Sequence, residues 1–274
     1  MDLQILFTRA KTLPVMPAIM QELLSSLDSD LLELPELASK LAKDQVLSAN
    51  VLKMANSAAF RGQSQLDSID AAVIRLGLSR VRSLVVAASL STVNPGQHFN
   101  HQQYWEQAMY VALLSQTLAE FCDASPDVAF TCGMLHSIGE LMIVSAAPEQ
   151  AGLIELSMEQ GETRVVAQRQ VLGLDYSEIG GELAKRWQFA PVIVSAIEQQ
   201  LNPLGHKPVS PYAVLIRLAI FVHHALVAGV APNLLVNNLP ASLCNQIELQ
   251  TDGLSDALAS VGEKVKESLS GTPA

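Results

Sequence analysis

Apolar residues recur along this chain at intervals of three and four, the spacing of helices packed on one side. After Ser79, for example, Val81, Leu84, Val85 and Ala88 lie on one stripe. The pattern contains no run of strict alternation, so it predicts an all-α fold. The predicted helices lie near residues 17–28, 35–43, 46–56, 68–76, 102–122, 126–144, 163–172, 175–187, 191–200 and 209–229.

A polar segment from Ser91 to Gln103 interrupts this pattern and contains Asn94-Pro95-Gly96. Asn, Pro and Gly in succession are typical of turns and loops. We therefore place a domain boundary here. It separates an N-terminal helical bundle, residues 1–96, from a second helical unit, residues 97–274.

The tail of the chain carries another regular stripe. From residue 253 onward its apolar positions are Leu254, Leu258, Val261, Val265 and Leu269. One apolar face on a terminal helix has to be buried against something. We expect this helix to dock on the body of the protein or on a second chain, which leaves a homo-oligomer open.

The charge balance argues against nucleic acid as a partner. The net charge is −10, so phosphate backbones and anionic lipids are repelled on average. Residues 36–52 resemble a helix-turn-helix, but Lys53 is the only cation of its second helix. Recognition helices bring Arg or Lys to phosphates and base edges, so two ordinary packed helices explain this segment better than DNA binding does.

Nothing in the sequence predicts secretion or a membrane span. The N-terminus lacks the basic region of a signal peptide, and the three cysteines lie inside apolar stretches, as reduced buried thiols do. The apolar stretch Tyr212 to Ala231 is interrupted by Arg217, His223 and His224, and a central Arg costs about 2.5–3.5 kcal/mol in a bilayer. We expect a buried core helix and a cytoplasmic protein.

The string Gly133-Met134-Leu135-His136-Ser137-Ile138-Gly139-Glu140 sets one histidine among apolar and small residues. On a helix, His136 and Glu140 share a face and form half of a metal site, which needs three or four ligands. The alternative, which we favour, is a core histidine hydrogen-bonded to a neighbour. Cys132 also lies one turn from His136, but its apolar neighbours indicate packing rather than a reactive thiol.

Arg217 and His224 are seven residues apart, so they stack on one face of the predicted helix 209–229. This polar seam predicts either a pocket wall or an internal ion pair with a buried carboxylate. The adjacent His223 and His224 point about 100° apart and are poorly placed to bind one ion together.

The sequence contains no glycine-rich phosphate loop, no dinucleotide-binding fingerprint and no nucleophile elbow. It therefore predicts no nucleotide or other cofactor.

Several strings, in this order and spacing, resemble the HD-related output domain (HDOD) family. They are Leu13-Pro14-Val15-Met16-Pro17, Asp44-Gln45-Val46-Leu47-Ser48, Val51 to Ser57, Ala71 to Leu78, and Gly133 to Gly139. Together they extend over residues 13–200. The resemblance implies an HD-like helical core preceded by an N-terminal helical bundle, and a bacterial signalling or regulatory role.

The HDOD family is similar to HD-domain phosphohydrolases, which hold divalent metal with a His, a His-Asp doublet and a later Asp. Here His136 keeps half of the doublet, but Ser137 replaces its Asp. Gln107 stands at the earlier His and Ile220 at the later Asp. A hydroxyl, an amide and an alkyl chain are weak ligands or none for a hard cation, so the resemblance implies no metal and no catalysis.

Two further positions point the same way. Tyr176 stands where relatives carry His, and Gln199-Gln200 where many carry paired His. The sequence thus predicts a non-catalytic regulatory module that acts through an unidentified signalling protein or a small-molecule ligand. The alternative is a residual metal-dependent phosphohydrolase with unrecognised ligands.

We expect the functional surface in the groove between the two helical units, beside the Asn56-Ser57 turn and His136. Asn56 and Ser57 either lock the turn that leads to Phe60 or contact a partner, and both interpretations are open. The candidate interaction or pocket residues are Asn56, Ser57, His136, Tyr176, Arg217 and His224.

Overall fold

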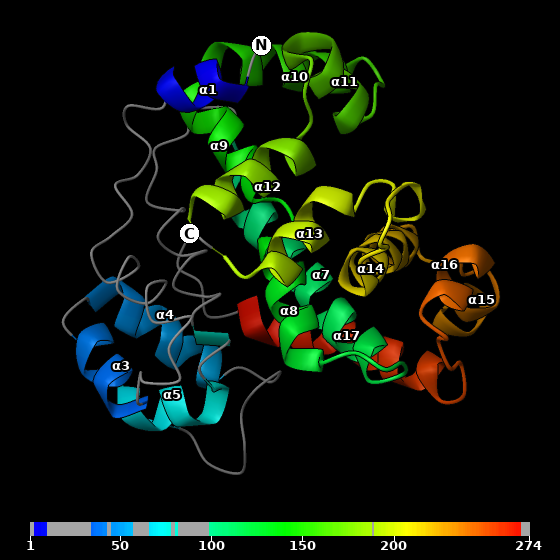
Figure 1. Ribbon diagram of the computed structural model, residues 1–274. Helices are drawn as coiled ribbons and strands as arrows, with labels where there is room; N and C mark the ends of the chain where they lie inside the picture. Colours follow the sequence, from blue (N-terminus) through cyan, green and yellow to red (C-terminus); the bar gives the residue numbers. More distant parts are fainter. Residues whose placement is uncertain are drawn as a thin grey trace.

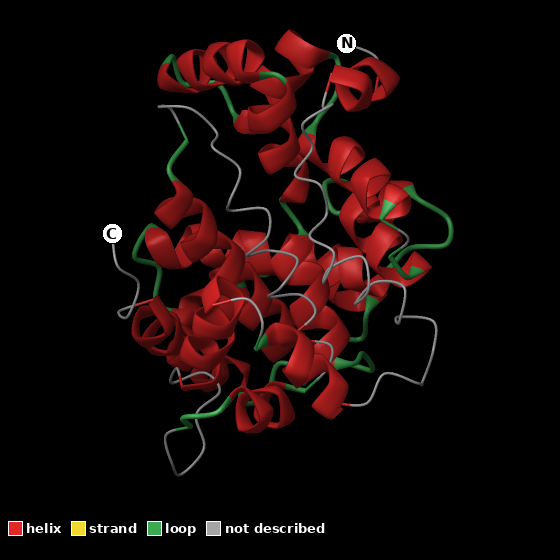
Figure 2. Ribbon diagram, turned by 90° about the vertical axis from the view of Figure 1, so that its left-hand side faces the viewer, coloured by secondary structure: helices red, strands yellow, loops and turns green. Residues whose placement is uncertain are grey.

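The computed structural model describes residues 3–9, 34–42, 45–56, 66–77, 80–81, 99–187 and 189–269. Within these ranges every regular element is a helix and there is no strand (Figures 1 and 2). The prediction of an all-α protein is therefore confirmed. The expected helix 17–28, the Leu13 to Pro17 string, Ser57 and most of the polar segment Ser91 to Gln103 lie outside the described residues.

A small bundle forms the N-terminal unit. Its helices are α3 (Leu34–Leu41), α4 (Gln45–Asn56) and α5 (Ile69–Leu76), which pack on one another. The Ser68 hydroxyl caps α5 by accepting a hydrogen bond from the Ala71 amide. At the other end Gly77, with a φ of +78°, ends the helix in a conformation that favours glycine.

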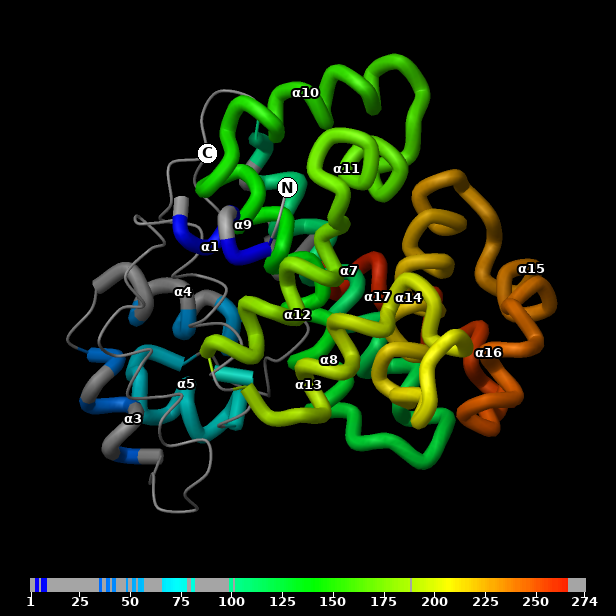
Figure 3. The backbone as a smooth tube through the Cα atoms, turned by 45° about the horizontal axis from the view of Figure 1, so that its top comes forward, coloured from blue at the N-terminus to red at the C-terminus, as the bar shows by residue number. Residues whose placement is uncertain are grey.

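The second unit is larger and is built around α7. Its helices are α7 (His101–Ala119), α8 (Pro126–Leu135), α9 (Ile138–Ala146), α10 (Pro148–Glu159), α11 (Arg164–Leu172), α12 (Tyr176–Arg186), α13 (Pro191–Gln199), the 3₁₀ turn η1 (Pro203–Gly205), α14 (Pro211–Val227), α15 (Pro232–Asn237), α16 (Ala241–Gln246) and α17 (Leu254–Leu269). Helix α7 packs against α8, α14 and α17. Figure 3 shows α10 and α11 as a hairpin at one edge of this unit.

Local sequence explains where these helices begin. Ser125 precedes Pro126, and Ser210 precedes Pro211. In both cases the serine hydroxyl accepts an amide hydrogen bond from the first turn, and the proline fixes the backbone at the first helical position.

Two glycines allow close helix crossings. A Cβ on Gly133 would lie 2.7 Å from the Cα of Ala112, so α8 crosses α7 backbone to backbone. A Cβ on Gly139 would lie 2.0 Å from the carbonyl oxygen of Tyr176, so the start of α9 lies directly against the start of α12. These crossings bring α7, α8, α9 and α12 together around His136 and Ser137.

The first helix, α1 (Leu3–Arg9), packs on α9 of the second unit, although the bundle follows it in the chain. Leu6 and Phe7 are buried, and the Arg186 guanidinium of α12 lies 4.2 Å from the centre of the Phe7 ring. Arg80 reaches the second unit too, with Nη2 2.6 Å from Asp127 Oδ1 of α8. The predicted boundary at residue 96 lies outside the described residues.

The structure corrects the predicted helix 126–144. It is two helices, α8 and α9, separated at Ser137 by a backbone with φ −109° and ψ 17°. Taken together, Pro126–Ala146 is long and apolar enough to cross a membrane, but 78% of its apolar window is buried inside the protein. Helices α1, α10, α15 and α16 were not predicted.

The C-terminal stripe docks on the body of the protein. Leu254, Leu258, Val261 and Val265 are all fully buried, and α17 packs against α7 and α15. The sequence left open whether this helix packs on its own chain or on a second chain, and it packs on its own chain.

Candidate functional site

The four positions compared with HD-domain ligands lie on three neighbouring helices. His136 follows the last residue of α8, and Ser137 comes next. Gln107 is on α7 and the buried Ile220 is on α14, and both helices pack against α8. The four positions therefore lie on helices that pack against one another. His136, Ser137 and Ile220 are buried there, and Gln107 is half-buried.

His136 is buried, and both its ring and its backbone are engaged in hydrogen bonds. Its Nδ1 lies 2.7 Å from the carbonyl oxygen of Gly133, to which it donates. Its own carbonyl oxygen accepts a hydrogen bond from Nε2 of Gln200, also across 2.7 Å. Burial lowers the pKa of the ring from 6.5 to about 4. His136 has the geometry of a neutral core histidine.

The less favoured interpretation, in which His136 and Glu140 form half of a metal site, does not fit the local backbone. Because the helix breaks at Ser137, the two residues do not share the face of one continuous helix. Glu140 instead faces Arg164 of α11, with 3.4 Å between Oε2 and Nη1, and the same nitrogen lies 3.1 Å from Oε1 of Glu155. Burial raises the pKa of Glu140, and the Arg164 charge partly offsets this.

Ser137 interacts with Tyr104 of α7. The phenol of Tyr104 is buried, which raises its pKa, and a hydrogen bond with the Ser137 side chain partly counters that rise. The Ser137 hydroxyl thus has a neutral hydrogen-bond partner, and its burial needs no charged group or metal.

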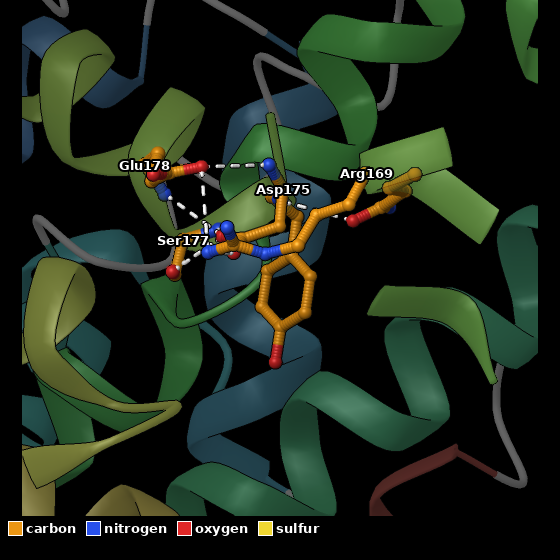
Figure 4. Close-up of polar contacts among 6 residues, drawn as sticks. Arg169, Asp175, Ser177 and Glu178 are labelled. Carbon is orange, nitrogen blue, oxygen red and sulfur yellow. Dashed lines mark hydrogen bonds and ion pairs between the residues drawn. The ribbon is translucent and has the colours of Figure 1, made fainter. Parts of the chain in front are cut away.

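Tyr176 begins α12 and is held there by a polar network (Figure 4). Its backbone amide donates to Oε1 of Gln168 across 2.9 Å. The buried Asp175 carboxylate caps the helix by accepting from the Ser177 and Glu178 amides, and Nη2 of Arg169 lies 2.6 Å from its Oδ2. This network sets the position of the Tyr176 side chain next to the site.

The Tyr176 phenol is buried as well. Burial raises its pKa, and the charges of Glu140 and Asp175 raise it further, whereas those of Arg217 and Arg164 lower it. The structure therefore brings two of the predicted residues, Tyr176 and Arg217, into electrostatic range of each other and of Glu140.

Arg217 and His224 are both exposed on α14. Of the two alternatives for this seam, an internal ion pair of Arg217 is not seen with the residues that the structure describes, and a pocket wall stays a prediction. The inward-facing histidine is His223, whose ring centre lies 4.9 Å from that of Tyr110 and whose buried Nδ1 has no hydrogen-bond partner. Burial lowers the pKa of His223 to about 4.

Asn56 uses both ends of its side-chain amide on one residue. Nδ2 donates to the Leu66 carbonyl oxygen, and Oδ1 accepts from the Leu66 amide, both across 2.7 Å. This is the locking geometry that the architectural interpretation of Asn56 predicted. A role in contacting a partner stays a prediction for Asn56, and Ser57 lies outside the described residues.

Within the described part of the chain, no three His, Cys, Asp or Glu side chains gather in a way that could hold a metal ion. Cys132, one turn before His136, is buried, and burial raises the pKa of its thiol. A thiol that resists ionisation is a poor nucleophile.

Sequence reasoning missed two residues of this region, Arg164 and Tyr104, and named Gln200 without its hydrogen bond to His136. A signal existed for Arg164, since it is the first Lys or Arg after Arg82 and follows nine acidic residues. An isolated cation after such a stretch indicates a partner carboxylate. No comparable signal marks Tyr104.

An all-helical protein with an HDOD-like fold is the class that these elements define. A family model for the HDOD domain matches residues 13–203, which is more than half of the 274 residues. The chain belongs to the HDOD family.

Solved structures with this fold come from several bacteria. A protein of Shewanella amazonensis SB2B named "Putative phosphohydrolase" is 32% identical, with 97% of each chain covered and a TM-score of 0.80. An HDOD domain protein with unknown function from Geobacter sulfurreducens is 22% identical, with 98% of this chain and 96% of that one covered and a TM-score of 0.76. The second likeness shows the fold alone.

Among curated proteins, an uncharacterized protein of Treponema pallidum (strain Nichols) is 26% identical over 251 residues. The match covers 89% of this chain and 48% of that protein. The chain thus spans about half the length of this relative.

Proposed function

We propose that this chain is a non-catalytic regulatory module of bacterial cytoplasmic signal transduction, acting through a protein partner or a small-molecule ligand. The state of His136 and Ser137 carries the proposal. Both residues are buried, and each is committed to hydrogen bonds inside the protein: His136 with Gly133, and Ser137 with Tyr104. Side chains held in this way stabilise the fold rather than present ligands to a cation.

The other two positions support the same proposal through their chemistry. The amide of Gln107 is a weaker ligand for a hard cation than an imidazole or carboxylate, and the alkyl chain of Ile220 is not a ligand at all. A solved structure with this fold, from Marinobacter aquaeolei VT8, is named "Putative signal transduction protein". With a net charge of −10, we propose a protein or small-molecule partner rather than nucleic acid or membrane.

Metal content and hydrolysis test this proposal together. The chain is purified without chelator and assayed for bound metal, and for phosphodiesterase and nucleotide phosphohydrolase activity with Mg, Mn, Fe or Ni. We expect neither stoichiometric metal nor turnover. Activity that is lost in His136→Ala but kept in His206→Ala, a matched change at an exposed histidine, would overturn the proposal.

A residual phosphohydrolase is the second candidate, and two observations favour it. One is the 32% identity with the Shewanella protein. The other is the pair of imidazoles from α8 and α14: His223 is near enough to lower the pKa of His136, and its Nδ1 is unpartnered. This candidate predicts metal-dependent activity that His223→Ala abolishes.

A further inference from the structure

The outer surface of α14 and α15 is unusually apolar. In the described part of the chain, ten large apolar side chains are exposed, and five of them lie between residues 204 and 234. Val227 is 73% exposed and Leu234 56%, with Phe221 and Val230 beside them in the sequence. We call the outer surface formed by Arg217, Phe221, Val227, Val230 and Leu234 the α14–α15 face. Clustered exposed apolar residues mark sites of interaction.

This face also differs from the rest of the chain in charge. Residues 199–247 contain Lys207 and Arg217 but no Asp or Glu, in a protein whose net charge is −10. Arg217 is exposed on the same side of α14 as Phe221, one helical turn away. The α14–α15 face is therefore apolar and weakly basic, and it suits an apolar surface that carries acidic groups.

The α10 helix of this same chain presents such a surface. Leu153 is 55% exposed and Leu156 52%, one turn apart, and a Cβ on Gly152 would meet nothing within 4 Å. Glu149 and Glu159 are exposed toward the two ends of the helix. These four charged and apolar residues, Glu149, Leu153, Leu156 and Glu159, are called the α10 face.

The sequence that leads up to and includes α10 is acidic, although Arg164 of the neighbouring α11 pairs with Glu155. Residues 83–163 contain nine Asp or Glu and no Lys or Arg. The two exposed apolar faces of the chain thus carry charge of opposite sign, which is the complementarity that sets orientation and partner choice at an interface.

Within one molecule the two faces do not cover each other. Helix α10 packs on α9 and α11, whereas α15 packs on α14 and α17, and the leucines and valines named above stay exposed. Figures 1 and 3 both show α10 and α15 at separate edges of the protein.

We infer that the α14–α15 face of one molecule docks on the α10 face of a second copy of the same chain. The two faces are different surfaces, so the contact is heterologous, and it builds a head-to-tail ring or an open row. Repulsion between copies that each carry a charge of −10 keeps this association weak. Arg217 of the α14–α15 face is also within electrostatic range of Tyr176, but the inference does not depend on the proposed function.

Sedimentation velocity of the full chain over a range of concentrations tests the inference. The wild type should show a mass that rises with concentration. Leu153→Gln with Leu156→Gln removes the apolar part of one face, and Val227→Gln with Leu234→Gln that of the other. Each double variant should self-associate at least about 100-fold more weakly than the wild type. Ile74→Gln, at a side chain that is 66% exposed on α5, should behave like the wild type.

Mixing the two double variants gives the decisive result. Each retains the face that the other lacks, so an equimolar mixture should form a dimer that neither forms alone. A wild type that stays monomeric throughout overturns the inference, and so does a mixture that stays monomeric while the wild type associates. Binding of the wild type, but not of the Val227/Leu234 variant, to phosphatidylglycerol vesicles, without self-association, would assign the face to a membrane instead.

Discussion

The side-chain amide of Gln200 donates a hydrogen bond to the backbone carbonyl oxygen of His136 across 2.7 Å. The same nitrogen donates to the Ile197 carbonyl oxygen across 2.9 Å. Gln200 is completely buried, and this pair of bonds fastens the end of α13 to the break between α8 and α9. The conformation of the chain at His136 therefore depends on a residue 64 positions later.

Replacing Gln200 with leucine should destabilise the protein. The change keeps the side-chain volume but leaves the buried His136 carbonyl without this donor, at a cost of about 1–3 kcal/mol in the free energy of unfolding. Urea denaturation measures the effect. Gln170→Leu, at an exposed glutamine on α11, is the matched control, and equal denaturation midpoints for the two variants would contradict the prediction.

Alanine at two helical glycines should have opposite effects. In Gly139→Ala the new Cβ would lie 2.0 Å from the Tyr176 carbonyl oxygen, so α9 and α12 must move apart, at a cost of about 1–3 kcal/mol or more. In Gly152→Ala the Cβ meets open space, and the helix gains about 0.5–1 kcal/mol. Thermal unfolding of both variants checks the signs, and a neutral Gly139→Ala would refute the close crossing.

Asn56→Ala should lower the melting temperature, because it removes both hydrogen bonds to Leu66. The expected loss is about 1–3 kcal/mol. Asn237→Ala, at an exposed position on α15, serves as the control. If Asn56→Ala lowers stability but leaves pull-down of cellular partners unchanged, the residue is architectural. If Asn56→Ala instead weakens pull-down and leaves stability unchanged, the role of Asn56 is to contact a partner and not to hold the turn.

Stability should fall in acid partly because of His136. Its pKa drops from 6.5 to about 4 on folding, so between these values the unfolded chain binds a proton that the folded chain does not. The contribution of His136 to the free energy of unfolding is about 3 kcal/mol. It is fully present above pH 6.5 and is lost as the pH falls toward about 4. Urea denaturation at neutral pH and near pH 4, with the wild type and His136→Gln, measures the difference.

His136→Gln should lose less stability than the wild type over this interval, since it has no imidazole to protonate at that position. Comparing the two proteins is necessary because His223, whose pKa is also lowered, acts in the same direction, whereas the raised pKa of Glu140 acts in the opposite one. Parallel pH profiles for the two proteins would contradict the assignment to His136.

Periodicity predicted the long helices because each has one face in the core. It was wrong over 126–144, where apolar residues surround His136 on all sides and hide the break. That break depends on tertiary contacts, namely the Gln200 amide and the close approach of Gly139 to Tyr176. The short helices α15 and α16 escaped prediction because six residues are too few to show a 3.6-residue repeat.

The sequence comparison could place Ser137 and Ile220 opposite the metal ligands of HD-domain phosphohydrolases, because such a comparison needs only residue identity at matched positions. The sequence did not reveal which residues contact the side chains at this site. Tyr104 contacts Ser137 from another helix, and Arg164 pairs with Glu140 because the packing of α10 on α9 and α11 brings the start of α11 near α9. Such pairings follow from helix packing, which a residue pattern alone does not specify.

The docking of α1 on α9 and Arg186 makes the N-terminal bundle an insertion in the topological sense. Helix α1 lies on the larger unit, the next described helices, α3, α4 and α5, form the bundle, and α7 belongs to the larger unit again. A fragment that begins at residue 99 would lack the Phe7 side chain and expose its binding surface on the larger unit. Removing the bundle while keeping the fold therefore requires two cuts and a short linker, not one truncation.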